Sequence, residues 1–157
     1  MEDVHISRAD FEDPRLARFL QAHLDDIEPT APPGSRHALD LSALDSPRVR
    51  MWVATDEEGI VGTAALAALG EDHEELKSMR TEPRARGRGV ARTLLEHALD
   101  DARARGVARV SLETGSMEFF APARALYART GFVPCPPFGS YVVDPHSTFW
   151  TMELATR

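Results

Sequence analysis

The sequence predicts a single α/β domain built on a mixed β-sheet, and three observations support this. Strand-like runs alternate with amphipathic helical patterns along the chain. Some neighbouring strands are joined by short turns and others by helices, which implies both antiparallel and parallel pairs. The length of 157 residues suits one domain with one core. We therefore expect residues 1–157 to form one domain.

The first half of the chain contains one clear helix and four strands. Residues 4–8 alternate in polarity and predict a short strand. Asp13 and Pro14 then predict a helix start, with the aspartate as N-cap, and the helix extends over residues 14–26. Its apolar residues recur at intervals of three and four and form one buried face: Leu16, Phe19, Leu20 and Leu24. The segment EPTAPPGSR, residues 28–36, is a loop because it contains three prolines, and residues 40–44 allow one helical turn. Strands are expected at 50–56, 60–69 and 75–81.

The second half contains the strongest helical pattern. Seven apolar residues form one stripe and Gly106 ends the helix; the stripe is Val90, Ala91, Leu94, Leu95, Ala98, Leu99 and Ala102. A strand over 107–114 and a short helix over 121–130, ended by Gly131, follow. The last 25 residues contain two strands separated by CPPFGS. This order of strands and helices defines the expected α/β fold.

Composition excludes several classes of function. Eighteen Lys and Arg against 25 Asp and Glu give a net charge of −7, which argues against a nucleic-acid or anionic-membrane binder. The single cysteine, Cys135, cannot form an intramolecular disulfide and fits a reducing compartment. No apolar run is long enough to span a membrane, and the N-terminal residues are acidic rather than basic and then apolar. We expect a cytoplasmic protein.

The most informative segment is KSMRTEPRARGRGVARTLL, residues 77–95. Gly87 and Gly89 let the chain curl closely around a ligand, and the N–H groups of residues 87–91 lie at a helix N-terminus. Four arginines and no acid occur between Arg84 and Arg92, which suits a small polyanion. A Walker phosphate loop needs a Gly-Lys pair and a dinucleotide fingerprint needs a glycine at position 92, so neither is indicated.

Two motifs together resemble the GNAT superfamily of N-acetyltransferases. Residues 84–89 follow R-x-x-G-x-G, the pattern of that family's acetyl-CoA pyrophosphate loop, and PARALYARTGF, residues 122–132, resembles its final helix motif. The resemblance implies acetyl-CoA as cosubstrate, no metal, and a mostly antiparallel sheet of six to seven strands flanked by about four helices. One position departs from the family: Phe120 replaces an asparagine that often contacts CoA.

The resemblance also implies how acetyl-CoA is bound. The backbone of the strand ending at Met79 would hold the pantetheine arm, and an N–H near Met79 would polarise the thioester carbonyl. Backbone N–H groups of the glycine turn would bind the pyrophosphate, with added charge from some of the arginines. The expected cofactor-binding residues are Met79, Arg80, Thr81, Arg86, Gly87, Arg88, Gly89, Val90, Ala91 and Arg92.

Tyr127 is the expected general acid, since a phenol can protonate a thiolate leaving group within hydrogen-bond reach. The alternative is a core tyrosine whose hydroxyl meets water. A carboxylate can take the proton of the acceptor ammonium directly or through water. The resemblance favours Glu75 as this general base, because it lies two residues before the lysine of the ELK segment, and Glu113 is the reserve. The alternative for Glu75 is an exposed carboxylate paired with Lys77 or an arginine.

Strand alternation allows only one of two adjacent glutamates to face the acetyl group. It places one set on one face, Glu75, Lys77, Met79 and Thr81, and a second set on the other, Glu74, Leu76, Ser78 and Arg80. His73 precedes both glutamates but lacks the second histidine of H-E-x-x-H, so a turn histidine is expected rather than a zinc ligand.

The acceptor pocket is expected between residues 28–37 and the segment PPFGSYVVDPH, which contribute His37, Tyr141, Asp144 and His146. Tyr141 and Glu113 are the predicted acceptor contacts. The expected reaction is direct attack of a primary amine, on a small molecule or at a peptide lysine or N-terminus, on acetyl-CoA. Cys135 as a covalent acyl carrier is disfavoured because no histidine adjoins it. The alternative function is an acetyl-CoA-binding sensor or protein-interaction module, and a homodimer is possible through paired sheet edges.

Overall fold

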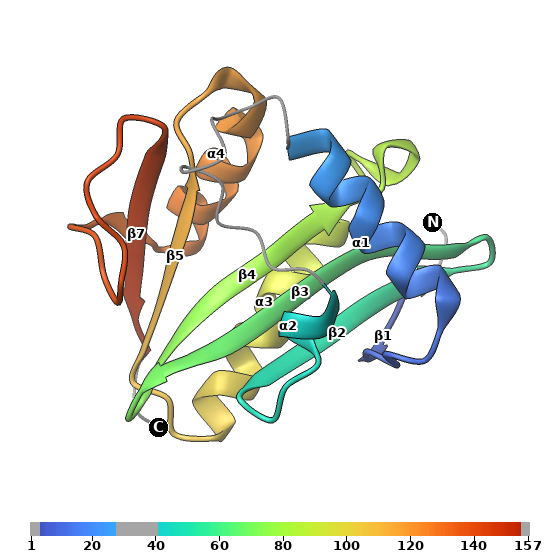
Figure 1. Cartoon of the computed structure of the whole chain (residues 1–157), viewed down its shortest axis with the longest axis horizontal. Helices are drawn as coiled ribbons and strands as arrows, with labels where there is room; N and C mark the ends of the chain where they lie inside the picture. Colours follow the sequence, from blue (N-terminus) through green and yellow to red (C-terminus); the bar gives the residue numbers. More distant parts are fainter. Residues whose placement is uncertain (1–3, 28–40, 155–157) are drawn as a thin grey trace.

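A seven-stranded sheet organises the computed structural model, which describes residues 4–27 and 41–154. The strand order is β1-β2-β3-β4-β5-β7-β6, and every neighbouring pair is antiparallel except β4 and β5 (Figure 1). The strands are β1 His5–Arg8, β2 Val49–Asp56, β3 Gly59–Gly70, β4 His73–Thr81, β5 Arg109–Gly115, β6 Val133–Pro134 and β7 Ser147–Glu153. The predicted mixed, mostly antiparallel sheet is confirmed.

Four α-helices connect the strands in the described part of the chain: α1 Pro14–Ile27, α2 Leu41–Leu44, α3 Val90–Ala104 and α4 Ala121–Thr130. Two short 3-10 turns, η3 Pro83–Ala85 and η4 Glu118–Phe120, precede α3 and α4. At the start of α1 the Asp13 carboxylate accepts a hydrogen bond from the Arg15 N–H at 2.9 Å. Asp13 therefore caps the helix as the sequence predicts.

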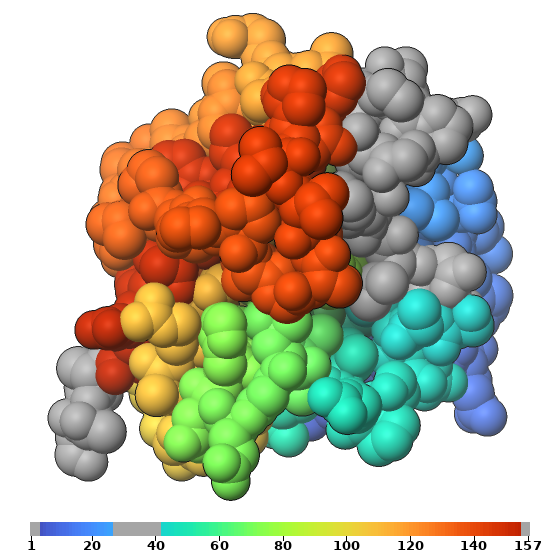
Figure 2. All heavy atoms as spheres, turned by 60° about the vertical axis from the view of Figure 1, so that its left-hand side comes forward, coloured from blue at the N-terminus to red at the C-terminus, as the bar shows by residue number. Residues whose placement is uncertain are grey.

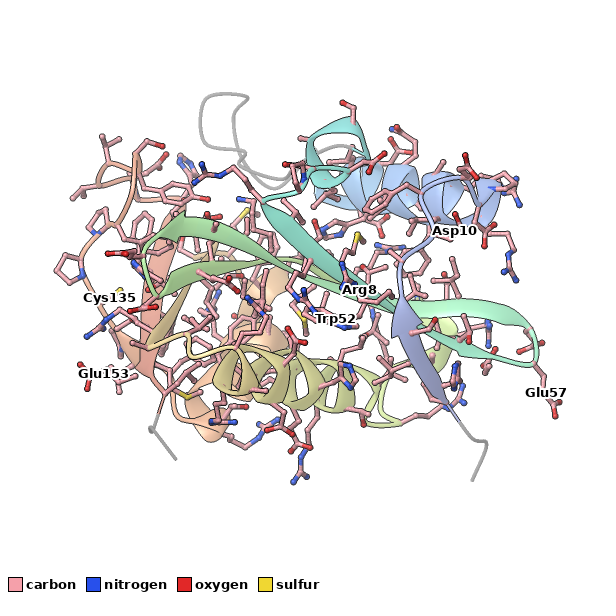
Figure 3. All side chains as sticks on the ribbon, turned by 90° about the horizontal axis from the view of Figure 1, so that it is seen from below. Arg8, Asp10, Trp52, Glu57, Cys135 and Glu153 are labelled. Carbon is pink, nitrogen blue, oxygen red and sulfur yellow. The ribbon has the colours of Figure 1, made fainter. Side chains whose placement is uncertain are left out.

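The helices cover both faces of the sheet (Figure 3). On one face α1 and α2 pack against β2 and β3 through Leu16, Leu20, Leu44, Met51, Val53 and Ala65. On the other face six of the seven residues of the predicted α3 stripe, all except Ala91, are buried together with residues of α4 and the sheet. Gly62 of β3 makes this contact close, because a Cβ there would lie 2.7 Å from Leu94 Cδ1.

Two predicted strands begin two residues away from their start in the structure, and other strand boundaries differ by one residue. β4 begins at His73 rather than residue 75, and β5 begins at Arg109 rather than residue 107. The N–H of Val107 donates to the carbonyl of Ala102, and the N–H of Ala108 donates to the carbonyl of Asp72. Residues 107 and 108 thus close the end of α3 before β5 begins, although both look strand-like in sequence.

A bulge interrupts β4 at Ser78, which has a φ of 55°. Lys77 is paired with Ala65 and Arg80 with Thr63, so two residues of β4 lie opposite one residue of β3. The Thr63 hydroxyl donates to the Ser78 carbonyl at 2.8 Å. The extra residue reverses the alternation of side chains between the two faces of the sheet. The faces predicted for β4 residues are therefore right before the bulge and wrong after it. Met79 packs against the α3-side core, and Arg80 instead occupies the face of Glu75 and Lys77.

β4 and β5 pair over four residues only, His73–Leu76 with Arg109–Leu112. Beyond these residues both strands continue, β4 to Thr81 and β5 to Gly115, and they diverge (Figure 1). The bulge begins just past the last paired residue of β4, and bulges bend the strand that carries them. The divergence leaves Ser78 and Met79 paired with neither β3 nor β5.

Candidate active site

The predicted acid and base residues gather where β4 and β5 separate. Glu75 is paired with Ser111, one residue before the last pair of the two strands, and Glu113 lies two residues beyond Ser111 along β5. Directly paired residues and alternate residues of a strand share a face, so the two glutamates lie on the same face of the sheet. Glu74 lies on the opposite face, where Arg105 binds it with two hydrogen bonds of 2.8 Å. Of the adjacent glutamates, only Glu75 therefore shares a face with Glu113.

Glu75, Lys77 and Tyr141 form a closed triangle of hydrogen bonds. The Lys77 ammonium donates to Glu75 Oε2 at 3.1 Å and to the Tyr141 hydroxyl at 3.0 Å. The Tyr141 hydroxyl donates to the same Glu75 oxygen at 2.5 Å. The side chains of Glu75 and Lys77 are 8% and 11% exposed. Glu75 is paired with Lys77, as the alternative interpretation has it, but the pair is buried rather than exposed.

The loop between β6 and β7 supplies Tyr141 and lies against β4 on this face (Figure 2). Its aromatic rings pack together: Tyr141 lies 5.2 Å from Phe138 and 5.5 Å from Phe149 of β7 between ring centroids. Burial raises the pKa of the Tyr141 hydroxyl well above its usual value, and the charge of Glu75 adds to this effect. Tyr141 is therefore a neutral phenol across the physiological pH range.

Tyr127 of α4 is 5% exposed and packs edge-to-face against Phe132, with ring centroids 5.8 Å apart. Burial raises the pKa of its phenol, and the charge of Glu113 raises it further. The ring belongs to the core, as the structural alternative holds, while its hydroxyl is within electrostatic reach of Glu113. A phenol of this kind keeps its proton at neutral pH and can still donate it.

The N-terminus of α3 has the features of an anion site. Gly87 and Gly89 adopt φ angles of 82° and 79°, which disfavour any residue with a Cβ, and a Cβ on either would meet open space. No side chain caps the helix and no acid lies in its first turn. The orphan N–H groups of this 15-residue helix therefore follow a turn in which two residues, Gly87 and Gly89, have no side chain, which fits a phosphate group.

Three of the arginines around this turn pair with acidic residues that lie outside residues 84–92. Arg84 and Arg88 contact Asp56 at the end of β2, at 3.1 and 3.5 Å. Hydrogen bonds from Arg84 lower the pKa of Asp56 to about 2. Arg92 pairs with Glu96 one helical turn away at 3.0 Å. Arg86 is exposed and makes no ion pair within the described residues.

Arg80 connects β4 to α1 through its side chain. The guanidinium is 7% exposed, forms an ion pair with Asp26, and lies 5.3 Å from the centre of the Phe19 ring. Its Nε is buried and has no hydrogen-bond partner in the described part of the chain. Since the side chain is bound to α1, a contact with acetyl-CoA at this residue would come from the backbone, as the resemblance implies.

Several other sequence candidates lie outside this cluster. His73 is bound to the Ser111 hydroxyl at 2.8 Å, and His146 is paired with Asp144 at 3.1 Å. His37 lies outside the described residues. Across residues 4–27 and 41–154, no group of three or more His, Cys, Asp or Glu could hold a metal ion. None of the described helices is both long and apolar enough to cross a membrane.

Sequence reasoning missed Lys77 as part of the site. Its spacing of two residues from Glu75 is compatible with an ordinary strand-surface pair, and only the contact with Tyr141 distinguishes it. Phe120 also has a structural explanation: its ring occupies the space above Gly115, at the end of β5. An asparagine at this position would leave that contact unfilled.

Comparisons with known proteins identify the family of this chain. Residues 13–132 match the model of the acetyltransferase (GNAT) family. The chain is 40% identical to the uncharacterized N-acetyltransferase YsnE of Bacillus subtilis over 96% of this chain and 100% of that protein. It is also 40% identical to the uncharacterized N-acetyltransferase YedL of Escherichia coli, over 95% of this chain and 94% of that protein. A solved structure of a proposed acyl-CoA N-acyltransferase from Klebsiella pneumoniae is similar with a TM-score of 0.80 and 29% identity, covering 97% and 98% of the two chains. The chain belongs to the acetyltransferase (GNAT) family and is an N-acetyltransferase.

Proposed function

We propose that this N-acetyltransferase transfers the acetyl group of acetyl-CoA to a primary amine by direct attack of the amine on the thioester. One observation carries the proposal. β4 and β5 separate after four paired residues, and the candidate acid and base residues lie next to the point where the strands separate. Glu75 and Glu113 lie on its acceptor side, and Tyr127 is within electrostatic reach of Glu113.

Acetyl-CoA binds along β4 and the start of α3 in this proposal. The unpaired backbone at Met79, with Arg80 and Thr81, holds the pantetheine arm, and an N–H near Met79 polarises the thioester carbonyl. The pyrophosphate lies at the glycine turn, against the N–H groups of residues 87–91. Arg86 supplies side-chain charge, and Arg88 and Arg92 contribute only by exchanging their acidic partners for phosphate.

Two proton transfers complete the reaction. The acceptor ammonium loses a proton to the base unit that contains Glu75, and the departing thiolate gains one from Tyr127. The phenol of Tyr127 is protonated before transfer, and the role requires that its hydroxyl lie within hydrogen-bond reach of the thiolate. Glu113 is a second carboxylate on the acceptor side and attracts the cationic amine. The acceptor class is a small-molecule amine or a peptide lysine or N-terminus.

The proposal also covers the cellular location of the enzyme, its substrates and its assembly. A net charge of −7 and a single cysteine suit a one-domain cytoplasmic enzyme that acts on acetyl-CoA and an amine rather than on nucleic acid. A homodimer through a sheet edge is the proposed assembly, with β1 and β6 as the two edges available.

Calorimetric titration with acetyl-CoA, followed by a thiol-release assay, tests this function. The panel contains spermidine, an aminoglycoside, free amino acids and a lysine-containing peptide. Binding together with CoA release on one class of amine supports the proposal and identifies the acceptor class. Binding without turnover across the panel favours the sensing module, and failure to bind contradicts the assignment of residues 84–91.

A further inference from the structure

We infer that the proton of the acceptor ammonium reaches Glu75 through the hydroxyl of Tyr141, and that Lys77 is the positioning residue that holds these two groups. This inference rests on the proposed function and specifies how its base works. It assigns Tyr141 a part in the chemistry beyond contact with the acceptor, and it gives a role to Lys77.

The direction of each hydrogen bond in the triangle is fixed by the chemistry of its members. An ammonium group can only donate and an ionised carboxylate can only accept. Lys77 therefore donates to both partners, and Tyr141 must donate its proton to Glu75. The hydroxyl is thus aligned in advance to give its proton to Glu75 when its oxygen receives another.

Burial separates the roles of the carboxylate and the phenol. The Glu75 side chain is 8% exposed, and the oxygen that Lys77 contacts is the same one that Tyr141 contacts. Tyr141 comes from the loop that lies against β4 on this face (Figure 2), and its side chain is half-buried, whereas Glu75 is buried. In this inference an acceptor amine therefore reaches the phenol before the carboxylate.

The proton balance of the step is simple. An N–H bond of the acceptor ammonium breaks and an O–H bond forms on Tyr141, while the original Tyr141 O–H bond breaks and an O–H bond forms on Glu75. The products are a neutral amine, a neutral phenol and a protonated Glu75. Burial raises the pKa of Tyr141, so the phenol passes a proton on rather than becoming a phenolate.

Other ionisable groups surround Glu75 and shape any pH profile. Lys77 and His73 lie on its own strand, Glu113 on β5 and Tyr141 on the loop. Lys77 is the cation in direct contact with the carboxylate. Its ammonium also donates to the Tyr141 hydroxyl, so it fixes the positions of the two oxygens between which the proton moves.

The test compares three variants in the thiol-release assay, with the panel amine that gives the highest wild-type rate. Tyr141→Phe keeps the ring contacts with Phe138 and Phe149 and removes only the hydroxyl. We expect Tyr141→Phe and Glu75→Gln each to lower kcat about 100-fold with little change in KM. The double variant should be no more than about threefold slower than the slower single variant, because both act in one transfer. A Tyr141→Phe variant that keeps more than about a third of kcat, or losses that multiply in the double variant, would overturn the inference.

Two controls separate chemistry from structure. Glu74→Gln changes the neighbouring glutamate on the opposite face and should leave kcat near the wild-type value. Lys77→Met should lower kcat about tenfold with little change in KM, because the Glu75 and Tyr141 oxygens lose the ammonium that holds both of them. Lys77→Arg, which keeps a cationic donor, should recover most of the lost kcat. An unchanged kcat in Lys77→Met contradicts the positioning role.

The two proposals fail in different ways. If the wild-type enzyme acetylates a panel amine and Tyr141→Phe does so equally well, only the relay is wrong. If the wild-type enzyme binds acetyl-CoA and acetylates no amine, the proposed function is wrong and the relay falls with it.

Discussion

The ring of Phe120 lies so close over Gly115 that a Cβ built on this glycine would come within 2.2 Å of it. Phe120 is the N-cap residue of α4, the helix that carries Tyr127, and Gly115 is the last residue of β5. The contact therefore sets the distance between the end of β5 and the helix that bears the proposed acid.

Gly115→Ala should accordingly destabilise the protein. The new methyl group has to displace the Phe120 ring, an overpacking change that costs about 1–3 kcal/mol. Urea unfolding monitored by circular dichroism measures the effect. Gly70→Ala is the matched control, since a Cβ at Gly70 meets nothing within 4 Å at the end of β3. Equal stability of the two variants would show that Phe120 moves aside without cost.

Tyr127→Phe should lower kcat by about ten- to ten-thousand-fold, because it removes the proton intended for the thiolate. The phenyl ring retains its contact with Phe132, so the melting temperature should change little. Calorimetry should give an acetyl-CoA Kd within about twofold of wild type, since the hydroxyl acts on the leaving group. An unchanged kcat would remove Tyr127 from the mechanism.

Arg86→Ala should weaken acetyl-CoA binding more than Arg92→Ala does. Arg86 makes no ion pair within the described residues, whereas Arg92 is already paired with Glu96. We expect about a three- to tenfold rise in Kd for Arg86→Ala and less than about twofold for Arg92→Ala, measured by calorimetry at low salt. The difference should shrink at about 0.5 M salt, where exposed charges are screened. The reverse order of effects would assign the phosphate contact to Arg92.

His23 of α1 should make the protein less stable in mild acid. Burial and the charge of the nearby Arg80 together lower the pKa of His23 to about 4. The charge of Asp26 acts in the opposite direction and has a smaller effect. The unfolded chain therefore binds the extra proton below about pH 6.5 and the folded protein only near pH 4. Stability from this group is complete above pH 6.5 and is lost as the pH falls toward 4, by up to roughly 3 kcal/mol.

Denaturant unfolding at pH 7 and pH 4.5 checks this dependence. His23→Gln cannot take up the proton, so it should lose less stability between the two pH values than the wild type. His5→Gln, at an exposed histidine of β1, should behave as the wild type does. A His23→Gln variant with the same loss as the wild type would mean that the histidine is not held neutral by the fold.

Local patterns were enough to predict most of the architecture. The apolar stripe of α3, the Asp13 cap of α1 and the glycine turn before Val90 each depend on residues within a few positions of one another. Such features follow from backbone conformational preferences and from the 3.6-residue period of a helix, which operate at short range. The glycine turn before α3 and the family could therefore be predicted from the chain itself.

The arrangement of the acceptor side was decided by tertiary contacts. Tyr141 and Glu75 are 66 residues apart, and only the path of the β6–β7 loop over β4 brings their oxygens to 2.5 Å. Arg84 and Arg88 both contact Asp56 at the end of β2. The charges within residues 84–92 give no indication of this partner, because it is distant in sequence. The bulge at Ser78 reversed the faces of Met79 and Arg80, because one extra residue shifts a period of two. Periodicity along the chain specifies elements and their buried faces, whereas the contacts between distant side chains depend on how those elements pack.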